Sequence, residues 1–276
     1  MNIKIVADSS ANLLSMDAVD FASVPLKLVT DTREYVDDAH LDAARMMADL
    51  AAYKGHSGSS CPNVGDWLEA FGDAQYIFTL AITQNLSGSH NAALQAKEVY
   101  EEQHPDRKVC CLETLTTGPE LVLIAEKLRE LAAQGLDFDQ IREQITAYME
   151  KTHLAFMLSS VDNLAKNGRV SPLIAKAVGF LNIRIVGKAS DSGTFQQMHK
   201  CRGEKKGLDA LLGLMKDEGF SGGPVRIVHA FNEPGAQALK ELVMAEFPDA
   251  DVTIGKTGGL CSFYAEQGGL LVGFEG

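Results

Sequence analysis

Short apolar runs alternate with longer stretches of helical spacing along the first half of the chain. The runs are rich in β-branched and aromatic residues, as buried strands are. The predicted strands of this half are Ile3–Val6, Val24–Val29, Tyr76–Ile82 and Lys108–Leu112. Between them, apolar residues at helical spacing predict helices, for example over Leu41–Tyr53. This alternation predicts a parallel sheet covered by helices on both faces.

The pattern changes after about residue 151. The strand Leu154–Leu158 precedes a short helix, and Ile183–Gly187 and Thr194–His199 predict a hairpin. No low-complexity linker separates the two halves, so we expect them to pack closely. We therefore predict an α/β protein of two domains. An N-terminal parallel sheet flanked by helices would occupy residues 1–151, and a C-terminal α/β (or α+β) domain would occupy residues 152–276.

Three of the predicted strands end in turns that carry hydroxyl groups. These turns contain Asp8 with Ser9 and Ser10, Ser87 with Ser89, and Thr116 with Thr117. The carboxyl ends of parallel strands meet at one edge of an open α/β sheet, which is where ligands bind. Three such turns at one edge would make a polar rim that accepts an anion. The alternative is that each is an ordinary strand-to-helix turn with its own cap.

The turn Ser87-Gly88-Ser89 leads into a stretch of strong helix formers. We expect this helix to run from Ser87 to about Gln103, with Ser87 as its candidate N-cap. A helix N-terminus offers unpaired backbone N–H groups and the positive end of the helix dipole, which together suit an anion. Ser87 is therefore a candidate ligand residue, and the alternative is that it only caps the helix.

A loop dense in glycine, serine and proline covers residues 54–63. Loops of this composition are often simple connectors, although function also concentrates in them. The hydroxyls of Ser59 and Ser60, held in place by Pro62, are candidates to face a ligand carboxylate.

Arg169 follows a glycine in a turn rich in polar atoms. Such a cation can pair with an acid inside the fold, or it can dock a partner or a phosphate through its planar fork of donors. The segment Leu173–Leu181 that follows is almost uncharged. It is either part of the core or the wall of an apolar cavity between the two domains.

The composition narrows the classes of function. A net charge of −12 over 276 residues argues against nucleic acid as a partner. No apolar run reaches the roughly eighteen residues that a membrane-spanning helix needs, so we expect no stable membrane insertion. The first residues lack the regions of a signal peptide, and the five cysteines form no C-x-x-C pair. We therefore expect a cytoplasmic protein with reduced thiols.

The search for catalytic motifs gives no candidate. The sequence contains no P-loop, no G-x-S-x-G elbow, no Rossmann glycine motif and no H-E-x-x-H pair. We therefore expect no catalytic residue, no metal and no cofactor.

Four motifs occur in order between residues 5 and 171: Ile5-Val6-Ala7-Asp8-Ser9-Ser10-Ala11-Asn12-Leu13, Ser59-Ser60-Cys61-Pro62, Leu86-Ser87-Gly88-Ser89, and Leu164 with Gly168-Arg169-Val170-Ser171. They resemble the I-V-T-D-S-T-A-D-L, T-S-Q-P, L-S-G-T and L-x-x-x-G-R-I-S segments of the DegV family. This bacterial family includes the fatty-acid-binding subunit of fatty acid kinase.

The resemblance implies a specific function. Members of the family hold one long-chain fatty acid in a tunnel between their two domains. Their carboxylate ligands, carried over to this chain, are Ser59, Ser87 and the N–H of Gly88. The resemblance also implies that Arg169 lies near the carboxylate and takes part in docking an ATP-binding kinase subunit. That partner phosphorylates the fatty acid, so the chain itself is not expected to be an enzyme.

The sequence departs from the family pattern in three places. Ser59 and Cys61 replace the more usual threonine and glutamine, and Glu113-Thr114 replaces a commoner Asp-Ser. The C-terminal H-x-G-P-G motif is not evident, and its region, residues 254–265, lacks the histidine. Two alternatives therefore stay open beside the fatty acid carrier. One is a binding protein for another amphiphilic carboxylate without a kinase partner, and the other is a small-molecule kinase or acyltransferase in its own right.

Overall fold

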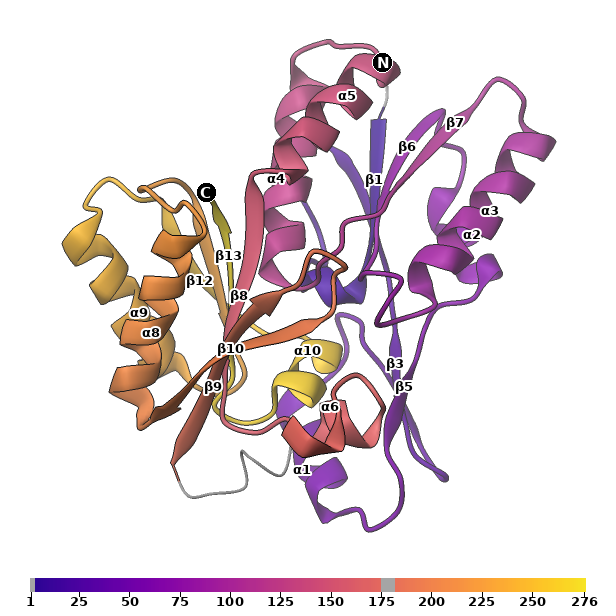
Figure 1. The fold of residues 1–276 in the computed structure, drawn as a ribbon. Helices are drawn as coiled ribbons and strands as arrows, with labels where there is room; N and C mark the ends of the chain where they lie inside the picture. The colour runs from indigo at the N-terminus through magenta and orange to yellow at the C-terminus, as the bar shows by residue number, and fades with distance from the viewer. Residues whose placement is uncertain (1–2, 175–181) are drawn as a thin grey trace.

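The computed structural model describes residues 3–174 and 182–276. Most of the segment 173–181, expected to be core or cavity wall, lies outside these residues. Two large sheets stand side by side with helices on their outer faces and between them (Figure 1).

The first sheet is parallel, with the strand order β2-β1-β6-β7. Its strands are β1 (Ile3–Asp8), β2 (Asp20–Val24), β6 (Tyr76–Leu80) and β7 (Lys108–Leu112). Successive side chains of each strand point to opposite faces. Apolar side chains of these strands are buried on both faces, so both faces are apolar. Helices α2 (Val64–Phe71) and α3 (Ser89–Gln103) cover one face, and α4 (Pro119–Ala133) and α5 (Phe138–Met149) cover the other. The predicted parallel sheet flanked by helices is confirmed.

The second sheet has six strands in the order β10-β9-β8-β13-β11-β12. They are β8 (Thr152–Leu158), β9 (Ile183–Ala189), β10 (Phe195–Arg202), β11 (Val225–His229), β12 (Val252–Lys256) and β13 (Leu270–Glu275). Only β11 and β12 pair in parallel, so the sheet is mixed, and the predicted hairpin is the antiparallel pair β9–β10. Helices α8 (Glu204–Asp217) and α9 (Glu233–Glu246) cover one face of this sheet.

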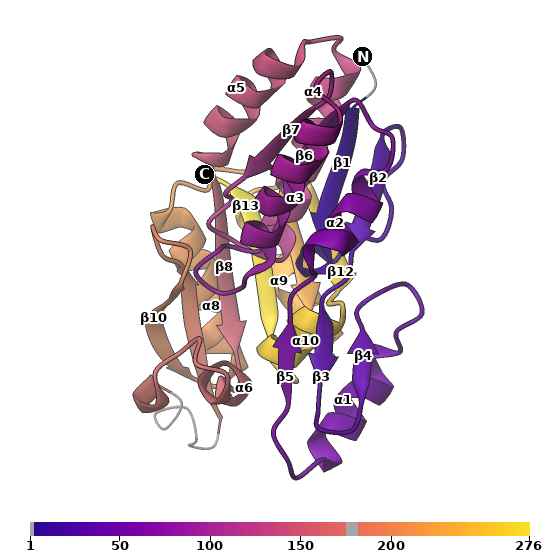
Figure 2. The ribbon, with the colours of Figure 1, turned by 90° about the vertical axis from the view of Figure 1, so that its right-hand side faces the viewer.

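A third, smaller sheet was not predicted. It has the order β4-β3-β5 and is built from β3 (Lys27–Val29), β4 (Glu34–Val36) and β5 (Gly58–Ser60), with α1 (Ala43–Ala52) beside it (Figure 2). The single strand expected over Val24–Val29 is wrong. Pro25 cannot donate a ladder hydrogen bond, so β2 ends at Val24 and the chain enters a different sheet at Lys27.

Two helices join the halves of the molecule. Figure 1 shows α4 between the large sheets, and its N-terminus contacts β13 so closely that a Cβ at Gly273 would lie 2.5 Å from the backbone nitrogen of Glu120. Helix α10 (Gly259–Ala265) packs against α1 and β3. Asp37 Oδ2 accepts a hydrogen bond from the Leu260 N–H at 2.9 Å, so a carboxylate just after β4 holds the start of α10.

Candidate ligand-binding site

A cavity lies between the two halves, on the face of the six-stranded sheet opposite α8 and α9. The empty space between its walls, including the open mouth, is about 840 Å³. Apolar side chains form most of the wall, chiefly from β8, α10 and the loop after β6. The polar side chains that line it are Ser59, Ser87, Thr116, Thr117, Arg169, Thr194 and Tyr264.

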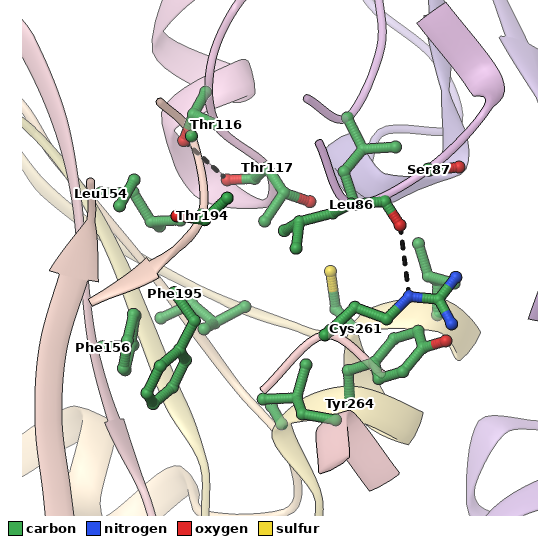
Figure 3. A pocket seen from close by; sticks show the side chains of 18 of the residues that line it. Leu86, Ser87, Thr116, Thr117, Leu154, Phe156, Thr194, Phe195, Cys261 and Tyr264 are labelled. Carbon is green, nitrogen blue, oxygen red and sulfur yellow. Dashed lines mark hydrogen bonds between the residues drawn. The ribbon is translucent and has the colours of Figure 1, made fainter. Parts of the chain in front are cut away.

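Four of these polar side chains, those of Ser59, Ser87, Arg169 and Tyr264, gather at one end of the cavity. Ser59 is on β5, and its Oγ lies 2.7 Å from the hydroxyl oxygen of Tyr264 on α10. The Arg169 guanidinium donates from Nε to the Leu86 carbonyl at 3.2 Å, and its Cζ lies 5.5 Å from the centre of the Tyr264 ring. Figure 3 shows Ser87 and Tyr264 on the same side of the cavity. The hydroxyls of Ser59, Tyr264 and Ser87 therefore lie at this end of the cavity, together with the Arg169 guanidinium.

Arg169 can still bind an anion. Its Nη1 donates a further hydrogen bond to the Asn167 carbonyl at 2.7 Å. Among residues 3–174 and 182–276, it forms no ion pair with a carboxylate, which removes the alternative that it pairs with an acid of these residues. A guanidinium carries five donors, so some remain available for a ligand carboxylate.

The start of α3 differs from the prediction. The helix begins at Ser89, and its N-cap is Gly88, so Ser87 lies one residue before the cap. The Ser87 Oγ accepts a weak hydrogen bond from the Ser89 N–H at 3.3 Å, and no side chain caps the helix. Ser89 cannot do so because its hydroxyl donates to the buried Asp8. The positive end of α3 therefore presents backbone N–H groups, and no capping side chain, beside Ser87.

The opposite end of the cavity is apolar. Phe156 on β8 and Phe195 on β10 stack with ring centroids 4.8 Å apart, and Leu154 lies on the same strand as Phe156 (Figure 3). Leu271 on β13 extends this wall. The cavity thus joins a polar end that suits an anion to an apolar end that suits a hydrocarbon chain.

Of the further candidates for a polar rim, Asp8, Ser9 and Ser60 lie outside the lining and Thr117 is part of it. Asp8 is fully buried and accepts hydrogen bonds from Ser10, from the Ile82 N–H and from Ser89. Burial raises the pKa of Asp8, and these hydrogen bonds oppose the rise. Ser9 Oγ accepts a hydrogen bond from the Leu26 N–H at 3.0 Å.

The other two rim candidates differ from each other. Ser60 is exposed, and its hydroxyl lies 3.5 Å from the Cys61 carbonyl. Thr117 does line the cavity.

Sequence reasoning missed α10, which supplies Tyr264 and Cys261 to the site. The signal was present, because Leu260, Phe263 and Tyr264 have helical spacing after a Gly-Gly pair. Cys261 is buried, and burial raises the pKa of its thiol to about 12. The thiol donates to the Ser10 carbonyl at 3.4 Å and accepts from Asn12 Nδ2, so it links the two halves.

Other classes of site find no support in the described ranges. Across residues 3–174 and 182–276, no group of three or more histidine, cysteine or acidic side chains is placed to hold a metal ion. No helix of these residues has the length and apolar character needed to cross a bilayer.

Comparison with known proteins decides the family. The family model described as an uncharacterised protein of the DegV family matches residues 2–275. The chain belongs to the DegV family. A DegV domain-containing protein of Streptococcus pneumoniae is 47% identical over 279 aligned positions, which cover 100% of this chain and 99% of that protein.

Two solved DegV structures share the whole fold. The fatty acid kinase (Fak) B3 protein of Streptococcus pneumoniae, loaded with linoleic acid, superposes with a TM-score of 0.98 at 46% identity, over 100% of this chain and 99% of that one. A DegV family protein of Eubacterium eligens, loaded with heptadecanoic acid, gives a TM-score of 0.97 at 42% identity, over 99% of each chain. DegV proteins similar to this chain therefore bind fatty acids.

Proposed function

We propose that this DegV protein binds one long-chain fatty acid in the cavity between its halves and presents the carboxylate to an ATP-binding kinase subunit. The observation that carries the proposal is the division of the cavity into one polar and one apolar end. Ser59, Ser87, the N–H of Gly88 and Arg169 would hold the carboxylate. The wall around Phe156 and Phe195 would hold the chain. The crystallised relatives, loaded with linoleic and heptadecanoic acid, support this assignment.

The energetics favour such a ligand. Burying a chain of about sixteen carbons at ~0.8 kcal/mol per CH₂ gives a gross term on the order of 10 kcal/mol. Association costs reduce this term but leave enough for the ligand to survive purification. Hydroxyl and guanidinium donors at the polar end would offset the desolvation of the carboxylate and fix its orientation.

Mass spectrometry of the purified protein, native and then after extraction with organic solvent, tests the ligand. We expect one fatty acid per chain. The double variant Ser59→Ala/Ser87→Ala should weaken fatty acid binding by roughly a hundredfold, because each serine gives a hydrogen bond to a charged group. Ser60→Ala is the matched control, since Ser60 neighbours Ser59 but lies outside the lining, and it should bind as the wild type does. An empty protein that takes up no added fatty acid would refute the proposal.

The kinase step has its own test. The protein loaded with fatty acid is mixed with ATP and the ATP-binding subunit of a bacterial fatty acid kinase, and acyl phosphate is trapped with hydroxylamine. We expect acyl phosphate only when both proteins are present. Arg169→Ala should reduce the rate by roughly tenfold or more, since it removes a charged donor at the mouth. Fatty acid binding without any acyl phosphate would instead support a carrier of amphiphilic carboxylates that has no kinase partner.

The place of action belongs to the same proposal. We place it in the cytoplasm, where ATP is available to the kinase subunit and all five cysteines, which are free in the structure, would stay reduced. In this assignment the chain takes no cofactor, and the division into domains at residues 1–151 and 152–276 describes the two walls of the cavity.

A further inference from the structure

One hydroxyl that lines the cavity has no hydrogen-bond partner in the part of the chain that the structure describes. Three threonines also line the cavity: Thr116 and Thr194 lie beside Leu154, and Thr117 lies between them and Leu86 (Figure 3). Thr194 Oγ1 lies 2.8 Å from Ser190 Oγ, and Thr116 Oγ1 donates to the Thr117 carbonyl at 3.4 Å. Thr117 Oγ1 is shielded from water and finds no partner among residues 3–174 and 182–276. An unpartnered buried hydroxyl is costly, so its presence in a binding cavity points to a group supplied by the ligand.

The neighbouring Cys261 thiol is a poor hydrogen-bond partner for the Thr117 hydroxyl. Figure 3 shows Thr117 and Cys261 reaching into the same space, between the Ser87 end and the Phe156–Phe195 end. The Cys261 thiol already donates its hydrogen to the Ser10 carbonyl. Burial raises the pKa of this thiol to about 12, and the Thr117 hydroxyl beside the sulfur opposes the rise only in part. The sulfur is a weak acceptor that already receives the Asn12 amide hydrogen, so it does not satisfy the Thr117 hydroxyl. Thr117 therefore lacks a good oxygen partner at a level where a bound acyl chain must pass.

We propose that the cavity selects a long-chain fatty acid that carries a hydroxyl group on its chain, and that Thr117 recognises this hydroxyl. A ligand hydroxyl suits the position because it can accept from Thr117 Oγ1 and donate to it in turn. A plain hydrocarbon chain leaves the Thr117 hydroxyl unpaired in an apolar surrounding. This inference rests on the proposed function, since it assigns the substrate class of the same cavity.

Calorimetry with two kinds of probe tests the inference. One probe is octadecanoic acid, and the others are its monohydroxy derivatives with the hydroxyl at successive carbons from the carboxyl to the methyl end. We expect one or two adjacent positions to bind roughly three- to tenfold more tightly than octadecanoic acid, the value of one net hydrogen bond. Derivatives hydroxylated elsewhere should bind more weakly than octadecanoic acid, because they bury a hydroxyl without a partner.

Two variants of Thr117 locate the effect. Thr117→Val has the same shape without the hydroxyl, and it should bring the affinity ratio of the favoured derivative to octadecanoic acid down to about one or below. Thr117→Ser keeps the hydroxyl and should keep the ratio above one. Thr253→Val, at an exposed position on β12, controls for the substitution itself and should leave the wild-type ratio.

The outcomes separate this inference from the proposed function. If octadecanoic acid binds and no hydroxy derivative binds more tightly, the inference is refuted and the fatty acid carrier stands. The same holds if a preference exists but survives Thr117→Val. If no fatty acid binds at all, both are refuted. The wild-type comparison alone decides the inference should Thr117→Val fail to fold.

Discussion

The turn after β1 and the turn after β6 carry the same kind of side chain and use it differently. After β1, the Ser9 hydroxyl holds the Leu26 backbone and the Ser10 hydroxyl donates to Asp8, so both are consumed inside the fold. After β6, the Ser87 hydroxyl makes one long hydrogen bond within the described residues and lines the cavity. Hydroxyls at the ends of parallel strands therefore mark a site only where no distant partner takes them.

Asp8 accounts for part of this difference, because it accepts hydrogen bonds from Ser10 and Ser89 in two separate turns. Asp8→Ala should therefore have the largest effect on the fold. It leaves the Ser10 and Ser89 hydroxyls and the Ile82 N–H without an acceptor, and it should lower the free energy of unfolding by about 4 kcal/mol. Urea denaturation of ligand-free protein measures this change.

Asp8→Asn serves as the control for Asp8→Ala. It keeps one acceptor oxygen in the same place and should cost clearly less. Equal stability of Asp8→Ala and the wild type would show that the two turns are not joined through this carboxylate.

The turn after β7 leads into α4, where Glu120 is buried and its Oε1 accepts a hydrogen bond from Thr152. Burial raises the pKa of Glu120 from 4.5 to about 7. Between pH 4.5 and pH 7, the Glu120 carboxyl has lost its proton in the unfolded protein and has kept it in the folded protein. The free energy of unfolding therefore falls as the pH rises through this range. The loss should approach about 3 kcal/mol and level off above pH 7.

Glu120→Gln removes this titration. The free energy of unfolding of Glu120→Gln minus that of the wild type should therefore increase by about 3 kcal/mol from pH 4.5 to pH 8. Urea denaturation across this range measures the difference. Glu69→Gln, at an exposed position, removes one carboxylate without the burial and should run parallel to the wild type. A constant gap between Glu120→Gln and the wild type would place the pH dependence in other groups.

A pair of serine variants gives the smallest effects and the most direct comparison. Ser9→Ala leaves the buried Leu26 N–H unpaired, and it should lower the free energy of unfolding by about 2 kcal/mol. Ser87→Ala should change it by less than about 0.5 kcal/mol, while it weakens fatty acid binding. Both proteins must be stripped of ligand before denaturation, because a bound ligand stabilises the folded state. The reverse ranking of the two variants would contradict the roles given to the two turns.

Much of the fold could be predicted from local patterns. Short apolar runs and helical spacing located the parallel strands, their helices and the β9–β10 hairpin, because these elements follow periodicity. The small sheet could not be found this way, since β3, β4 and β5 have only three residues each and depend on one another for pairing. Pro25 was the feature of the sequence that indicated two strands, β2 and β3, where one strand was predicted.

The candidate site was predictable by motif and not by position. The resemblance supplied Ser59, Ser87 and Arg169, and the structure brings all three to one end of the cavity. Tyr264 was missed because its role depends on α10 packing across the halves, a contact between residues 205 positions apart in the sequence. Whether a hydroxyl such as that of Ser9 or Thr117 stays free likewise depends on distant partners, which spacing does not reveal.

The position of β13 bears on how this protein is made. It pairs with β8 on one side and β11 on the other, so it joins the two parts of the six-stranded sheet. The ribosome synthesises β13 after every other strand of that sheet. Until it emerges, β8 and β11 have unpaired edges, and the wall behind α4 is open. A nascent chain that stops before Leu270 would therefore lack a closed cavity and would expose sheet edges that chaperones and proteases recognise.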